Sequence, residues 1–168
     1  MMVDALRRCL LRDLDSLADE IAAYLDDATV WALPAGAPNS GGTLALHLVG
    51  NLRHFVGAIL GKSGYQRQRE VEFSTRDLPR AELLALIATA RSEVADTLAT
   101  LDPAALDADY PLRLPFSAPE DGHIVPTGRF LVHLASHLAY HLGQVDYHRR
   151  LVTGDVKGVG AIGLTALY

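Results

Sequence analysis

Three histidines stand four residues apart in the segment HLASHLAYHLGQ, residues 133–144. On an α-helix, residues at this spacing lie on one face, with a rise of about 6 Å between them. Two neighbouring rings can therefore bind one metal ion, whereas His133 and His141, about 12 Å apart along the axis, are too distant to share it. The spacing predicts one chelating pair, one further histidine and the need for a third ligand from elsewhere in the chain.

A candidate for that third ligand lies in the segment LALHLVGNLRHF, residues 44–55. His47 stands between leucines, so we expect it to face the core, with Asn51 and His54 on nearly the same helical face. Helix bundles build interior metal sites from side chains on facing helices. Three neutral imidazoles leave one position of a tetrahedral ion open for water or substrate, which is typical of catalytic rather than structural zinc.

The same histidines are also compatible with a metal-free core, in which each buried ring nitrogen needs a hydrogen-bond partner. Asn51 and Gln144 are close enough in sequence to supply some of these partners. If a metal is present, a nitrogen-rich and carboxylate-poor site favours zinc or nickel over magnesium or calcium. The spacing alone leaves the metal site and the hydrogen-bonded histidine core as two open interpretations.

The elements that must position these residues are helices. Apolar residues at intervals of three and four predict four of them, near residues 3–25, 43–60, 77–101 and 127–152. No strand pattern accompanies them, so we expect an all-α fold, a four-helix bundle that forms a single domain over residues 1–168. Long connectors join the second helix to the third and the third to the fourth.

The connectors carry predictions of their own. We expect residues 26–42, which contain two prolines and three glycines, to form a loop anchored by a buried Trp31. The charged segment YQRQREVEFSTRD, residues 65–77, is expected to have little regular structure.

Three residues of these connectors are candidates for binding. Arg67 and Arg69 are solvated in one interpretation and grip an anionic substrate carboxylate in the other. His123 lies in the proline-rich stretch 102–126, where we expect a surface residue, with a fourth metal ligand as the alternative.

Composition limits the classes of partner. The formal net charge of -5 over 168 residues provides no basic face for nucleic acid. Cys9 is the only cysteine, which excludes an internal disulfide and a thiolate metal cluster. The sequence has no uncharged apolar run of about eighteen residues, so no membrane span is expected. We therefore expect a cytoplasmic protein with a small-molecule substrate and neither a nucleic-acid nor a membrane partner.

The motif H-x-x-x-H-x-G-Q at residues 137–144 resembles the signature of the DinB/YfiT superfamily. The segments LHLVGNLRHF and RQREVEF are similar to a pattern in one of its subgroups, and the resemblance covers most of residues 30–152. It implies a four-helix bundle of unusual connectivity, often a homodimer, that carries nickel or zinc on three histidines. By position in the motifs, these ligands are His47, His137 and His141.

The resemblance also implies supporting roles and an activity. His133 becomes a neighbour of the ligands and Gln144 a hydrogen-bonding partner, while His54 stands where glutamine is expected. The implied activity is transfer or isomerisation with a low-molecular-weight thiol such as bacillithiol or mycothiol, or metal-dependent hydrolysis. We favour a metal-dependent S-transferase or hydrolase, with no catalytic residue assigned. The alternative is a non-catalytic metal-binding or interaction module, related to stress.

Overall fold

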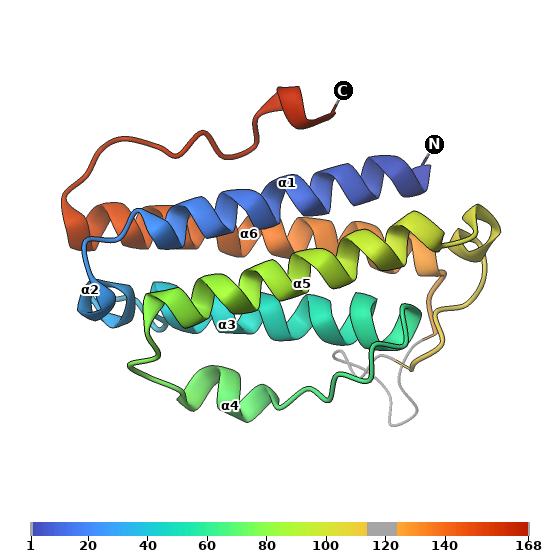
Figure 1. The fold of residues 1–168 in the computed structure, drawn as a ribbon, viewed down its shortest axis with the longest axis horizontal. Helices are drawn as coiled ribbons and strands as arrows, with labels where there is room; N and C mark the ends of the chain where they lie inside the picture. Colours follow the sequence, from blue (N-terminus) through green and yellow to red (C-terminus); the bar gives the residue numbers. More distant parts are fainter. Residues whose placement is uncertain (1, 114–123, 168) are drawn as a thin grey trace.

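The computed structural model describes residues 2–113 and 124–167 of the chain (Figure 1). Apart from one isolated β-bridge between Asp109 and Pro126, the regular structure of these residues is helical, which confirms the predicted all-α class. The elements are α1 (Met2–Ala22), α2 (Asp27–Trp31), α3 (Gly41–Leu52), the π-helical η1 (Arg53–Leu60), α4 (Arg69–Ser74), α5 (Arg80–Thr100), the 3₁₀ turn η2 (Pro103–Leu106), α6 (Thr127–Thr153) and the 3₁₀ turn η3 (Leu164–Leu167).

Four long segments run along the length of the molecule: α1, α3 with its continuation η1, α5 and α6 (Figure 1). α1 packs against α5 and α6, and α3 packs against the same two helices. The buried face of α1 includes the residues that the helical spacing predicts, namely Leu6, Leu10, Leu14, Leu17 and Ile21. The predicted end of this helix was too late, since α1 ends at Ala22 and Leu25 is exposed.

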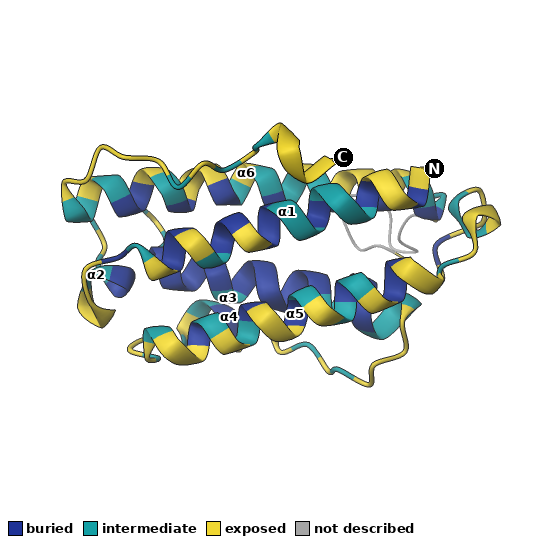
Figure 2. Cartoon of the chain, turned by 45° about the horizontal axis from the view of Figure 1, so that its top comes forward, coloured by how far each residue is buried: buried dark blue, intermediate teal, exposed yellow. Residues whose placement is uncertain are grey.

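The helix that carries His47 is the central element of the core. Every residue of α3 except Leu46 is buried, as the dark blue ribbon of Figure 2 shows. By length and composition the stretch Gly41–Leu60 is apolar enough to cross a membrane, but 67% of its apolar window is buried inside the fold. Its hydrophobicity on all sides is what burial between other helices requires.

The start of α3 is fixed by a cap and by close packing. The Ser40 hydroxyl accepts the Thr43 N–H at 3.1 Å and satisfies one free donor of the first turn. Gly42 allows Trp31 to lie against the helix, since a Cβ at this position would be 2.8 Å from the indole ring. The helix therefore begins slightly earlier than the predicted 43–60, at Gly41.

The segment predicted as a loop contains the short helix α2, so that prediction was wrong in part. The Asp26 side chain accepts the Thr29 N–H at 2.8 Å, and the Thr29 hydroxyl accepts the Asp26 N–H at 3.2 Å. This reciprocal pair is a capping box, which starts a helix. The prediction for Trp31 is confirmed, because its side chain is buried and its Nε1 donates to the Leu78 carbonyl at 3.0 Å.

The charged segment 65–77 is also more ordered than predicted, because it contains α4. Glu72, in the middle of this helix, is buried, and its carboxylate is paired with Arg67. The alternating charges suggested a solvated connector. In the fold, Arg67 instead neutralises the Glu72 carboxylate, and this pairing allows the carboxylate to be buried.

The last two predicted helices are confirmed with small differences at their ends. α5 begins at Arg80, directly after Pro79, where the missing N–H of proline is harmless. α6 ends at Thr153, and Gly154 follows with φ of 71°. That left-handed conformation is the common C-terminal stop of a helix and favours glycine.

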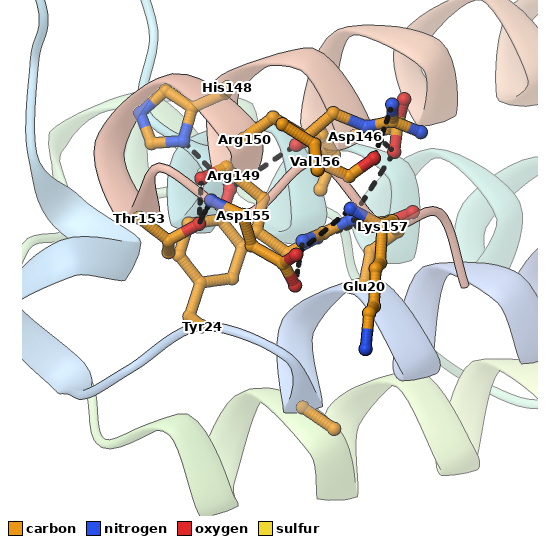
Figure 3. A network of polar contacts seen from close by, with 12 residues as sticks. Glu20, Tyr24, Asp146, His148, Arg149, Arg150, Thr153, Asp155, Val156 and Lys157 are labelled. Atoms are coloured by element: carbon orange, nitrogen blue, oxygen red, sulfur yellow. Dashed lines mark hydrogen bonds and ion pairs between the residues drawn. The ribbon is translucent and has the colours of Figure 1, made fainter.

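A buried charged network joins α6 to α1 and to the segment that follows α6 (Figure 3). The side chains of Glu20 and Arg149 are fully buried and form an ion pair. Arg149 also donates to the Lys157 carbonyl at 2.8 Å. Burial raises the pKa of Glu20, and the guanidinium of Arg149 opposes that shift. The network therefore holds α6 and the segment after it against α1, which is far from both in sequence.

Beside this network, Tyr24 and His148 form a neutral hydrogen-bonded pair (Figure 3). The His148 Nε2–H donates to the Ala32 carbonyl at 2.8 Å, which leaves Nδ1 to accept the Tyr24 hydroxyl at 2.7 Å. Burial lowers the pKa of His148, in agreement with a neutral ring. Both nitrogens of this imidazole are thus satisfied within the fold.

The Arg149 network can be tested with Arg149→Met, which keeps much of the side-chain volume and removes the charge. We expect a loss of about 3–5 kcal/mol in the free energy of unfolding, because Glu20 is left as an uncompensated buried charge. The matched variant Arg150→Met removes a half-exposed charge paired with Asp146 and is expected to cost less than about 1 kcal/mol. Urea denaturation measures both.

A double variant, Glu20→Leu with Arg149→Met, controls for packing. It is expected to recover most of the lost stability, because no lone charge stays buried. Equal losses in the two single variants Arg149→Met and Arg150→Met would contradict the special role of the buried pair.

Candidate metal centre

Three histidines from two helices meet between α3 and α6. His47 projects from α3, and His137 and His141 lie one turn apart on α6. Each offers one ring nitrogen, and these three atoms lie within 4.8 Å of one another. The Nε2 atoms of His47 and His137 are 3.4 Å apart. Of the described residues, these three are positioned to bind a metal ion.

The spacing of the nitrogens suits a tetrahedral cation. Two nitrogens bound to one zinc ion lie about 3.3 Å apart, because each Zn–N bond is about 2.0–2.1 Å long. The distance of 3.4 Å between the Nε2 atoms of His47 and His137 matches this edge. The full span of 4.8 Å is wider, so rotation of the rings would be needed to bring all three nitrogens onto one ion.

His47 is oriented by a buried carboxylate. Its Nδ1 lies 3.0 Å from Glu72 Oε2, and Glu72 in turn receives two hydrogen bonds from Arg67, of 2.6 and 2.8 Å. Burial tends to raise the pKa of Glu72, but the hydrogen bonds from Arg67 and His47 outweigh it and hold that pKa below its usual value. The ionised carboxylate accepts the Nδ1–H of His47, and the lone pair of Nε2 is left facing the other histidines.

The close approach of Glu72 depends on a glycine in the middle of α3. A Cβ at Gly50 would lie 2.1 Å from Glu72 Oε1, a distance that no side chain tolerates. Gly50 therefore has a packing reason to interrupt an otherwise apolar helix, where glycine costs about 1 kcal/mol relative to alanine. The contact places α4 against the part of α3 that carries His47.

His141 has a partner that fixes its tautomer in the same way. Its Nδ1 lies 2.6 Å from Gln144 Oε1. The amide oxygen accepts the Nδ1–H, so the lone pair of Nε2 faces away from Gln144. Both His47 and His141 are thus held in the tautomer that a metal ligand requires.

The His137 ring is neutral, and one of its two nitrogens lacks a hydrogen-bond partner among the described residues. Burial, together with the positive charge that His141, His47, His133 and Arg67 would place nearby, lowers its pKa to about 4. Its Nδ1 is buried without a hydrogen-bond partner among the described residues. Two neutral imidazoles whose Nε2 atoms face one another at 3.4 Å are favourable only when a proton or a cation lies between them. The donor set therefore fits a bound metal.

The remaining histidine of the stripe lies beside the group. The His133 ring stacks between Phe130 and His137, with centroid distances of 5.8 and 6.0 Å. His133 is exposed and lies outside the group of three nitrogens. His54, which follows in η1, packs its ring against Phe55 at 4.7 Å.

The other candidate residues from the sequence differ in burial and in their contacts. Asn51 is buried one turn beyond His47, and its Oδ1 has no partner among the described residues. Arg67 pairs with Glu72 and orients its carboxylate. Arg69 is exposed, and its guanidinium lies 4.8 Å from the Phe73 ring. His123 lies outside the described residues.

Sequence reasoning missed Glu72 as part of the centre. Glu72 is the second of two glutamates in RQREVEF, and in the sequence it resembled one charge among several. The burial of Glu72 and its contact with Gly50 are visible only after α4 packs on α3.

The fold is an all-helical one in which three histidines on facing helices are positioned to bind a metal ion. The profile of the DinB superfamily matches residues 10–145. The chain therefore belongs to the DinB superfamily. Comparisons with curated proteins and with solved structures gave no match.

The ligand assignment can be tested by alanine substitution. His47→Ala and His141→Ala are each expected to lose bound Zn²⁺ on dialysis, because two nitrogens hold the ion far more weakly than three. His133→Ala, on the same helix, is the control and is expected to retain the metal, since its ring lies outside the group. Elemental analysis of the dialysed proteins gives the metal content. Loss of metal from the His133 variant with retention in the His47 variant would overturn the assignment.

The role of Glu72 generates a separate prediction. Glu72→Gln keeps a hydrogen-bond acceptor for His47 but removes the negative charge, so we expect the affinity for Zn²⁺ to fall about 10–100-fold. Glu70→Gln makes the same change at an exposed position of the same short helix and should leave the affinity unchanged. Competition with a chromophoric chelator measures both. Equal affinities in the two variants would show that Glu72 does not support the centre.

Proposed function

We propose that this protein is a metal-dependent enzyme that transfers a low-molecular-weight thiol to a small electrophilic substrate. The observation that carries the proposal is the group of three imidazoles of His47, His137 and His141, with ligand atoms within 4.8 Å. Three neutral nitrogen donors leave a coordination position for an exogenous group, as in catalytic zinc sites. A donor set of nitrogens without carboxylates favours zinc or nickel.

The chemistry supplied by a bound divalent cation is a lowered pKa for a thiol or for water. The residues of the chain hold the ligands for this purpose. Glu72 and Gln144 each accept an Nδ1–H, which keeps the Nε2 lone pairs of His47 and His141 available. Burial lowers the pKa of both His137 and His141, which favours the neutral imidazoles that a cation needs as ligands.

We favour thiol transfer over hydrolysis because it is the activity that the resemblance of the histidine motifs implies. In the proposed reaction the thiol loses its proton to solvent, and its sulfur forms a bond to the electrophilic carbon. The bond from that carbon to its leaving group breaks, and the leaving group departs with the electron pair. In the hydrolytic alternative, water takes the place of the thiol.

We further propose that the chain folds as one domain, a DinB-type four-helix bundle, and works as a cytoplasmic homodimer. The four long helices and their mutual packing support the bundle. Support for the dimer comes from the exposed apolar side chains of Val132 and Tyr140 on α6, which a second copy would shield from water.

The enzymatic proposal is tested by turnover. Metal-loaded protein is mixed with one of several low-molecular-weight thiols and with monochlorobimane or an epoxide, and the conjugate is measured by fluorescence or mass spectrometry. We expect a conjugation rate well above that of the uncatalysed mixture, and His137→Ala is expected to reduce the rate to that background because it removes a ligand.

The same assay separates the enzyme from a binding module. If the wild-type protein retains its metal and still gives no more product than His137→Ala with any thiol, transfer is excluded and the non-catalytic metal-binding module is favoured.

A further inference from the structure

A pocket of about 340 Å³ opens beside the candidate metal centre, between α6 and the segment that joins α2 to α3. Its volume lies in the range of small-molecule sites, which is about 300–1,000 Å³. The walls are mainly apolar, with Asn39, Gln144 and His148 as their polar members. The apolar side chains are those of Pro34, Ala37, Pro38, Leu44, Tyr147 and Leu151. We call this cavity the proline pocket.

The proline pocket adjoins the three histidines along both helices. Leu44 precedes His47 by three residues on α3, and Gln144 follows His141 by three residues on α6. Each step is about 4.5 Å along a helix axis. Because α3 and α6 run in opposite directions (Figure 1), both steps lead to the same side of the metal centre. Gln144 belongs to the pocket wall and also bonds His141 at 2.6 Å.

The imidazole in the wall does not make the pocket polar. His148 lines the cavity, but its Nε2 donates to the Ala32 carbonyl and its Nδ1 accepts the Tyr24 hydroxyl. Neither nitrogen is left for a ligand, so the ring contributes an apolar surface. The pocket therefore favours ligands with an apolar surface, because removing that surface from water contributes about 25 cal/mol per Å².

The opposite side of the metal centre has a different character. Asn51 lies one turn beyond His47 in the direction away from Leu44, and its buried Oδ1 has no partner among the described residues. His133 lies one turn before His137 on α6. The proline pocket thus lies on the side of the centre away from Asn51 and His133.

We propose that the proline pocket binds the apolar part of the substrate, a short alkyl chain or an aryl group, while the reacting end lies at the three histidines. This inference rests on the proposed function, because it assigns the substrate class to that same centre. It predicts selection for electrophiles with an uncharged hydrocarbon group next to the reacting carbon. Small charged electrophiles are poor substrates, since they leave the pocket walls exposed to water.

The test uses binding and does not require turnover. Co²⁺-loaded protein is titrated with straight-chain alkyl hydroxamic acids, from acetohydroxamic to hexanohydroxamic acid, and the change in the visible Co²⁺ spectrum gives Kd. The hydroxamate head binds the metal, and the chain probes the pocket. We expect Kd to fall about fourfold for each added methylene until the pocket is filled.

Two matched variants locate the effect. Ala37→Trp places a large ring in the pocket and is expected to abolish the dependence on chain length while the Co²⁺ spectrum of the free protein is unchanged. Ala35→Trp makes the same substitution two residues earlier in the same loop, at an exposed position outside the pocket wall. It is expected to retain the wild-type dependence.

The outcomes separate this inference from the proposed function. If Co²⁺ binds but Kd is the same for every chain length, or if Ala37→Trp keeps the dependence, the inference is overturned and the metal centre stands. If the wild type binds no Co²⁺, both fail together. If Ala37→Trp converts a dimer to a monomer in sedimentation without changing the hydroxamate series, the pocket is covered by a second copy of the chain, and the inference is overturned.

Discussion

The hydrogen bond between His47 Nδ1 and Glu72 Oε2 is the contact on which the centre depends. It requires a buried carboxylate, and burial is tolerable only because Arg67 grips both oxygens of Glu72. It also requires Gly50, since any side chain there would occupy the space of the carboxylate. The short helix α4 also packs the Phe73 ring against that of His47, with 5.0 Å between the centroids. The hydrogen bond to the imidazole therefore accounts for a buried charge and an unusual glycine, and it helps to hold α4 on α3.

The two helices that carry the ligands are held by different means. α3 is surrounded on nearly all sides by other elements, so any shift of its axis would disturb the whole core (Figure 2). α6 is exposed along one side and is held near its C-terminal end by the Arg149–Glu20 ion pair and by the contact of His148 with Tyr24 (Figure 3). Because these anchors lie away from His137 and His141, they restrain the helix without occupying the metal centre.

Much of this arrangement could be predicted from local patterns. The spacing of His137 and His141 predicts a pair on one helical face, and the leucines around His47 predict that it faces inward. The long helices follow from apolar periodicity. The sequence could not reveal the partners of charged residues, because Glu20 and Arg149 are 129 residues apart and Glu72 is one of several acids in a charged segment. Pairing across the fold decides which charges are buried, and no local pattern records it.

A metal centre needs ligands held to within about 0.5 Å of their working positions. The nitrogens of the three histidines span 4.8 Å, which is wider than the tetrahedral edge of about 3.3 Å. α3 is held by burial and α6 by the Arg149–Glu20 pair, whereas an imidazole can rotate about its side-chain bonds. The Nε2 atoms of His47 and His137 already lie 3.4 Å apart, close to that edge, so the wider separation involves His141. Its hydrogen-bond partner Gln144 is exposed and can follow a rotation of the ring, and such a rotation would bring the third nitrogen closer to the other two.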